Sequence, residues 1–131
     1  MSGPTTVLTP FDTSLTIGTT PVIGAIPANP TRKALLISNN APPIEPTGTT
    51  APGPVPANAT PGAVVYVTFG EPNQAAVNPL HWPSPTTGTG IPIQAGQTFS
   101  LFPYAATDIS MGAQINMVAT AASTPVYVVE F

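Results

Sequence analysis

The sequence AVVYVTFG, residues 63–70, decides the fold of this chain. It concentrates β-branched and aromatic residues between Pro-Gly on one side and Gly-Glu-Pro on the other, the pattern of a strand between two breakers. Side chains alternate between the two faces of a strand, so Val65, Val67 and Phe69 share one face. Because the opposite face is also apolar or amphipathic, we expect this strand to lie inside a β-sandwich and not at a wet edge.

Weaker strand patterns surround this stretch. The pattern at residues 14–26 predicts two short strands or one bent strand, and the proline of Ile91-Pro92-Ile93 indicates an edge strand. Asn39-Asn40 is typical of a turn pair that is able to visit left-handed conformations. Further strand patterns occupy residues 31–40, 97–102, 114–119 and 126–131. The sequence thus predicts an all-β protein, an antiparallel β-sandwich or jelly-roll-like domain of seven or eight short strands with long Pro-rich loops.

A length of 131 residues fits one domain. We expect residues 1–13 to form an extended N-terminal arm and residues 14–131 a single β-sandwich domain with loop insertions at 41–62 and 71–90. The first insertion is rich in proline, which cannot join a central ladder. We interpret it as the tip of a hairpin whose two strands pair with each other.

The low charge content is the unusual feature of the composition. Asp, Glu, Lys and Arg make up 5% of the residues, against about 25% in an average domain. Either a secreted or structural protein tolerates a neutral surface, or neighbouring subunits cover much of it, since burying a charge is costly and burying threonine or proline is not. We favour the covered subunit.

Several classes of partner are disfavoured. The net charge is −3 and Arg32-Lys33 is the only basic pair, so a patch that could neutralise phosphates of a nucleic acid is absent. No run approaches the ~18 apolar residues of a membrane span, and the N-terminal sequence lacks the features of a secretory signal. Without cysteine, the chain has no disulfide and no thiolate ligand or nucleophile.

Candidate catalytic residues are few. His81 is the only histidine and stands beside Trp82 in a Pro-rich loop, which favours a simple loop residue over a general base. The five carboxylates show no spacing typical of an acid–base pair or a metal site; they are Asp12, Glu45, Glu71, Asp108 and Glu130. We therefore expect no enzymatic activity, no metal, no cofactor and no small-molecule substrate.

The order of segments resembles that of a known class of virion proteins. An Arg-containing strand pattern ends in Asn at residues 32–40, and a strand ending in aromatic-Gly follows at 65–70. An apolar-x-apolar turn pattern at 91–97 and a closing Val-Tyr-Val-Val-Glu strand at 126–130 complete it. In this order the chain is similar to small β-rich virion proteins of tailed bacteriophages, and in size and composition to capsid decoration (cement) proteins.

The resemblance implies a partner and a location. Such proteins sit on the outer capsid surface as trimers or dimers, so the expected partners are the major capsid protein and copies of this chain, after synthesis in the host cytoplasm. A tail, fibre or baseplate component and a small hydrolase using His81 or Glu71 remain as alternatives. Trp82 either packs on its own sandwich or anchors a contact. The predicted interface residues are Val7, Leu8, Phe11, Arg32, Lys33, His81, Trp82 and Tyr104.

Overall fold

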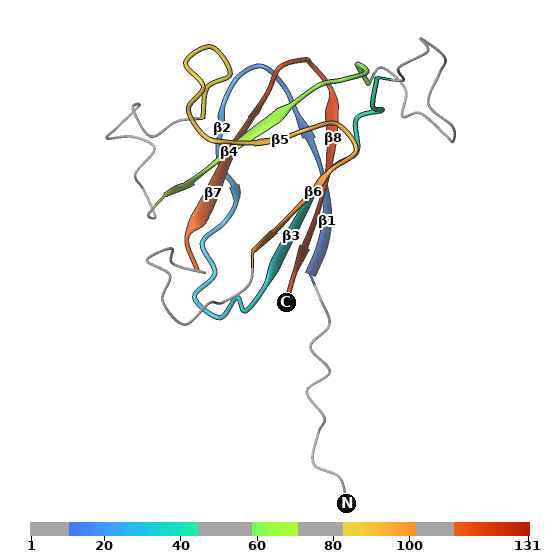
Figure 1. Cartoon of the computed structure of the whole chain (residues 1–131). Helices are drawn as coiled ribbons and strands as arrows, with labels where there is room; N and C mark the ends of the chain where they lie inside the picture. The colour runs from blue at the N-terminus through green and yellow to red at the C-terminus, as the bar shows by residue number, and fades with distance from the viewer. Residues whose placement is uncertain (1–10, 45–58, 71–82, 102–111) are drawn as a thin grey trace, which may run out of the picture.

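Two four-stranded antiparallel sheets form the protein (Figure 1). The computed structural model describes residues 11–44, 59–70, 83–101 and 112–131. Sheet A has the strand order β1-β8-β3-β6, and sheet B has the order β2-β7-β4-β5. No helix occurs in these described ranges. The predicted all-β sandwich is therefore confirmed.

The described residues contain eight strands, each of three to seven residues. Short strands are expected where Gly, Pro, Asn and Ser interrupt the apolar runs so often. The strands are β1 (Phe11–Ile17), β2 (Val22–Ile26), β3 (Leu35–Asn39), β4 (Val65–Gly70), β5 (Ile91–Ile93), β6 (Thr98–Leu101), β7 (Gln114–Ala119) and β8 (Thr124–Glu130).

The strand pairs are nested. The first strand pairs with the last, β2 with β7, β3 with β6 and β4 with β5, all antiparallel. The additional pairs β3–β8 and β4–β7 join these pairs into the two four-stranded sheets. Every connection except that between β4 and β5 passes from one sheet to the other. The chain thus follows the path of one long hairpin, folded over on itself, with β4 and β5 at its turn.

The core lies between the two sheets and is centred on the stretch at 63–70. As expected, Val65 and Val67 point inward and are fully buried, and Phe69 packs against the same core. The ring of Phe69 lies 6.3 Å from that of Phe99 on β6. Strand β4 pairs with β7 on one side and β5 on the other, so it is an interior strand, as the sequence predicts.

The proline-rich insertion at 41–62 joins strands of different sheets. Strands β3 and β4, which flank it, do not pair with each other, so the predicted hairpin is wrong. The amide of Gly62 donates to the carbonyl of Pro42 at 2.8 Å and closes the base of this connection. Residues 45–58 lie outside the described residues.

Other boundaries follow the sequence more closely. Strand β1 begins at Phe11, which pairs with Glu130, so residues 11–13 belong to sheet A and not to an arm. The rest of the expected arm, residues 1–10, lies outside the described residues. Residues 14–26 form two strands in opposite sheets, and Pro92 stands on an edge strand, as predicted. Within the insertion at 71–90, an antiparallel bridge joins Ser84 to Thr89.

Candidate contact surface

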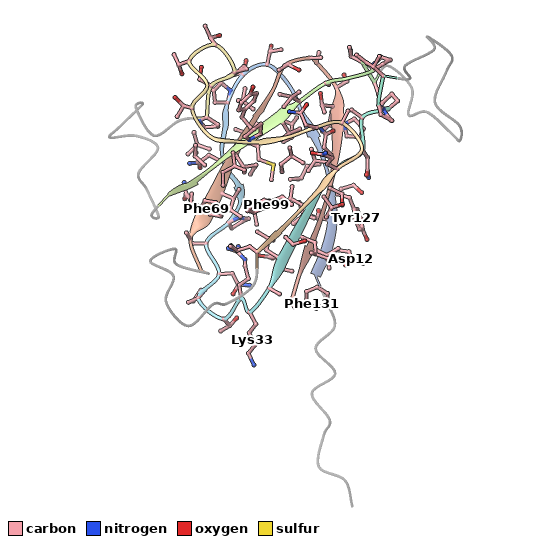
Figure 2. All side chains as sticks on the ribbon, in the orientation of Figure 1. Asp12, Lys33, Phe69, Phe99, Tyr127 and Phe131 are labelled. Atoms are coloured by element: carbon pink, nitrogen blue, oxygen red, sulfur yellow. The ribbon has the colours of Figure 1, made fainter. Side chains whose placement is uncertain are left out.

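Three of the predicted interface residues are described, and they lie around the C-terminal end of β8: Phe11 pairs with Glu130, Arg32 binds Glu130, and the amide of Lys33 donates to the carbonyl of Phe131. Phe11 begins the edge strand β1. Lys33 is exposed in the connection between β2 and β3, whereas its neighbour Arg32 is buried (Figure 2). The other five predicted residues lie outside the described residues; they are Val7, Leu8, His81, Trp82 and Tyr104.

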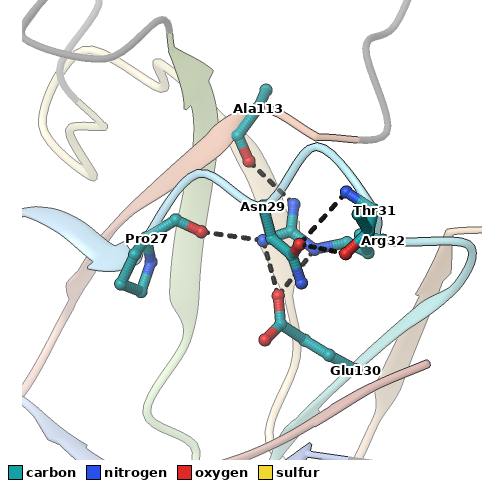
Figure 3. Close-up of polar contacts among 6 residues, drawn as sticks. All are labelled: Pro27, Asn29, Thr31, Arg32, Ala113 and Glu130. Carbon is teal, nitrogen blue, oxygen red and sulfur yellow. Dashed lines mark hydrogen bonds and ion pairs between the residues drawn. The ribbon is translucent and has the colours of Figure 1, made fainter. Parts of the chain in front are cut away.

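Arg32 forms an internal ion pair with Glu130 (Figure 3). Its Nε and Nη2 atoms lie 2.7 and 2.6 Å from Oε1 of Glu130, and the side chains are 0% and 9% exposed. Its Nη1 donates to the carbonyl of Ala113 at 2.8 Å, and Nη2 donates to that of Pro27 at 2.9 Å. One guanidinium therefore joins the end of β2, the start of β7 and the end of β8.

The contact of Arg32 with a neighbouring subunit stays a prediction, while in this fold its side chain is buried against Glu130. A guanidinium and a carboxylate that leave water must satisfy each other and their remaining hydrogen-bond groups inside the fold. Glu130 points into the sandwich, whereas Asp12 on the adjacent strand is exposed, so these two carboxylates lie on opposite faces of sheet A. They cannot form an acid–base pair with each other.

Asn39 connects the two sheets at the end of β3. Its Nδ2 donates to the carbonyls of Ala63 and Ile93, both at 2.8 Å, and its Oδ1 accepts from the amide of Ala41 at 3.0 Å. The side chain is buried and has partners for both donors and its acceptor. Neither Asn39 nor Asn40 has a positive φ, so the left-handed conformation that this pair is able to visit is not adopted here. Asn39 is a cross-link between sheets.

Asn116 fills an irregularity between β2 and β7. The register of this pair shifts between Val22 and Ile26, as at a β-bulge, and Gly24 within it has a φ of 69°. Oδ1 of Asn116 accepts the amide of Gly24 at 2.8 Å, and its Nδ2 donates to Oγ1 of Thr68 at 3.2 Å. The carboxamide thus replaces the ladder partner that the bulge removes.

Alternation at residues 114–119 suggests that Gln114 and Asn116 face water, yet all six residues of β7 are buried. The sequence does contain a signal for the burial of Asn116, because a glycine inside the pattern of β2 indicates a bulge. A bulge leaves a backbone donor that needs a partner on the neighbouring strand.

The outer face of sheet A combines a short apolar stripe with hydroxyl side chains and carries a single charged residue. Leu36 of β3 lies opposite Val129 of β8, and both are half-buried. Tyr127 and Pro125 continue this apolar stripe along β8. Hydroxyl side chains flank the stripe on β1, β3 and β6, and Asp12 is the one charged residue on this face; the flanking residues are Ser14, Thr16, Ser38, Thr98 and Ser100.

The single charge of this face is engaged by a neighbour. Tyr127 donates a hydrogen bond to Asp12, and this bond, followed by desolvation and the charge of Asp12, raises the pKa of the Tyr127 hydroxyl above its ordinary value (Figure 2). A carboxylate that accepts a hydrogen bond from a phenol hydroxyl presents less unsatisfied charge to an approaching surface. We call this face, from Asp12 and Ser14 on β1 to Ser100 on β6, the outer face of sheet A.

The described ranges contain neither a group of metal-binding side chains nor a membrane-spanning helix. These residues contain no group of three or more histidine or acidic side chains that could hold a metal ion. They also contain no helix long and apolar enough to cross a membrane. Comparison of the chain with known protein families, with characterised proteins and with solved structures gives no match.

Proposed function

We propose that this chain is a non-enzymatic virion protein that binds the outer surface of a phage capsid as a decoration subunit and stabilises the shell. The expected partners are the major capsid protein and further copies of the chain. The single observation that carries the proposal is the outer face of sheet A, which is broad, strand-built and almost free of charge.

A neutral face suits a permanent contact. Removing a charge from water costs roughly several kcal/mol unless a partner group replaces the water. Hydroxyl and aliphatic groups are covered at little cost. The centre of this face is the stripe formed by Leu36, Tyr127 and Val129, with a rim of serine and threonine. An apolar centre with a polar rim is the usual anatomy of a protein–protein interface.

The topology supports the same proposal. We infer from the nested pairs β1–β8, β2–β7, β3–β6 and β4–β5 that the sandwich has jelly-roll connectivity. Two-sheet jelly rolls of eight strands are common in viral capsid proteins, although a fold alone does not define a function. The topology is therefore secondary to the surface.

Internal cross-links favour a rigid subunit. Arg32 joins three segments at one end of the sandwich, and Asn39 joins the two sheets at a separate site. A face held by such links loses little conformational freedom on docking, which lowers the cost of association. Many copies on one particle would add individually weak contacts into a stable coat.

Electron microscopy tests the location. Antibodies against the purified chain are applied to intact particles of the phage that encodes it, followed by gold-labelled secondary antibody. Label distributed over the shell is expected. Label confined to the tail or its tip would replace the proposal with a tail, fibre or baseplate role, and particles without label would reject a virion role altogether.

Matched variants test the surface. Shells that lack the chain are mixed with wild type, with Ser100→Lys on the outer face of sheet A, or with Gln94→Lys, an exposed residue that follows β5 of sheet B. Wild type and Gln94→Lys are expected to bind the shells and to raise the temperature of genome release. Ser100→Lys should bind at least about tenfold more weakly, since a charge enters a desolvated interface. Equal binding of the two variants would exclude this face.

A further inference from the structure

The four edge strands of the sandwich are protected unequally. Strand β5 has three residues and contains Pro92, β6 has four residues, and β2 is distorted around Gly24. Shortness, proline and bulges are the devices that prevent an edge from pairing with another chain. Strand β1 has none of these three: its seven residues, FDTSLTI, pair in continuous register with β8, and no other strand of the described residues pairs with its second edge (Figure 1).

We propose that the free edge of β1 pairs antiparallel with β1 of a second copy, which joins the two A sheets into one eight-stranded sheet across a two-fold axis at Ser14. We assign a second copy as the occupant because β1 can pair antiparallel with itself along its whole length without placing like charges opposite each other. The inference rests on the edge and not on the proposed function, so a dimer that never binds a capsid would leave it intact.

The centre at Ser14 follows from the sequence of the strand. Antiparallel pairing about this residue is the only register that uses all seven residues. It places Phe11 opposite Ile17 and Thr13 opposite Leu15. It also places Asp12 opposite Thr16, whose hydroxyl can donate to the carboxylate, so two aspartates never face each other. Like charges directly opposite would destabilise such a pair.

The geometry of one sheet is preserved in this arrangement. Ser14 and its copy project from the same face, because directly opposed residues of an antiparallel pair share a face. Ser14 is exposed and lies on the outer face of sheet A, so the two outer faces become one continuous surface. The contact needs no change in the core of either subunit, since Asp12, Ser14 and Thr16 are all exposed.

The absence of cysteine allows a direct test by single-cysteine cross-linking. Residues opposed across the axis have Cα atoms about 4.5–5.5 Å apart, within the range of a disulfide. Ser14→Cys is therefore expected to form a covalent dimer under mild oxidation at least about tenfold faster than Ser100→Cys, an exposed residue of the opposite edge strand β6.

Thr16→Cys is the control for register. It is exposed on the same strand and the same face, but its copy lies about 13 Å away when the axis passes through Ser14, too far for a disulfide. Fast cross-linking of Thr16→Cys and not of Ser14→Cys would overturn the proposed axis. Equal rates for Ser14→Cys, Thr16→Cys and Ser100→Cys would show random collision and overturn the interface.

Sedimentation of the cysteine-free chain gives an independent readout. The wild type is expected to form a dimer whose dissociation constant rises at least about tenfold in Ser14→Lys, which sets two cations opposite each other. Ser100→Lys should dimerise as wild type does, although it is expected to impair shell binding, so the two proposals can fail separately. A wild-type chain that stays monomeric up to about 1 mM, or that forms a closed trimer, would overturn the inference.

Discussion

At the scale of single residues, the carboxamide of Asn39 satisfies three buried backbone groups. Asn39→Ala removes the donors to the carbonyls of Ala63 and Ile93 and the acceptor for the amide of Ala41. Because buried groups without partners are costly, we expect the free energy of unfolding to fall by about 3 kcal/mol. Urea denaturation measures this loss. Asn40→Ala, at an exposed neighbour, should change stability by no more than about 0.5 kcal/mol; equal losses would contradict the assigned role.

The basic pair offers a second matched comparison. Arg32→Ala leaves Glu130 buried without its cation, so we expect a loss of about 3–5 kcal/mol in the free energy of unfolding. Lys33→Ala changes an exposed side chain and should stay within about 0.5 kcal/mol of wild type. Thermal and urea unfolding of both variants decide the point. A stable Arg32→Ala protein would mean that the ion pair contributes little to the fold.

The Tyr127 hydroxyl gives a prediction for pH. Its pKa is raised, chiefly by the hydrogen bond to Asp12, so this bond stabilises the fold below the ordinary tyrosine pKa of about 10 and is lost as the pH rises through the higher folded value. Absorbance titration of phenolate, with Tyr127→Phe to assign the signal, should show a late-titrating tyrosine. Asp12→Asn should lower its pKa; an unchanged titration would show that Asp12 is not the cause.

The residue scale is also where the sequence was least informative. The inward positions of Val65 and Val67 follow from alternation, because hydrophobic burial acts on every second residue of a strand. The partners of Arg32 and Asn39 do not follow, since Glu130 and Ala63 are distant in sequence and only the fold brings them near. Basic residues are usually exposed, so the burial of the interface candidate Arg32 did not follow from the sequence.

At the scale of elements, the turn at residues 83–90 approaches β4 at Gly90. Gly90 has a φ of 118°, and a Cβ there would lie 2.9 Å from the carbonyl oxygen of Val67. We expect Gly90→Ala to lower the free energy of unfolding by about 3 kcal/mol through strain and overlap. Gly88→Ala is the control, because its φ is 70° but no atom lies within 4 Å, so strain alone remains at about 1 kcal/mol. Equal losses for the two variants in urea denaturation would contradict the close approach of Gly90 to β4.

Most elements could be predicted from local sequence. Breakers bound each strand, and Pro92 indicated an edge because it cannot donate to a ladder. Two elements were misjudged for the same physical reason. Strand β1 starts at Phe11, where pairing with Glu130 overrides the weak propensity of a threonine-rich segment, and the flanks of the 41–62 insertion belong to different sheets. Tertiary pairing decided both cases.

At the scale of the whole molecule, burial predicts an order of local stability. Strand β7 is buried along its whole length between β2 and β4, whereas β5 is a three-residue edge strand. In hydrogen exchange at neutral pH, we expect amides of β7 to exchange only by global unfolding and those of β5 to exchange by local opening. Mass spectrometry of peptic fragments measures both. Protection of β5 equal to that of β7 would contradict this gradient.

The sequence predicted the class of fold but not its topology. Alternation and breakers specify strands, yet they do not say which strand lies beside which, because that choice depends on contacts across the whole chain. The nested order β1-β8-β3-β6 and β2-β7-β4-β5 became visible only in three dimensions. The outer face of sheet A could not be predicted either, since its residues come from four separate strands.

The nested order has a consequence for biosynthesis. Strand β1 leaves the ribosome before β8, which must insert between β1 and β3. Sheet A therefore cannot be completed until Glu130 has emerged. Until then β1 and β3 lack the strand that pairs with both of them. A chain stalled or cleaved before β8 would present the edges of these two strands to other nascent chains, so chaperone capture during translation should protect its yield more than any later rescue.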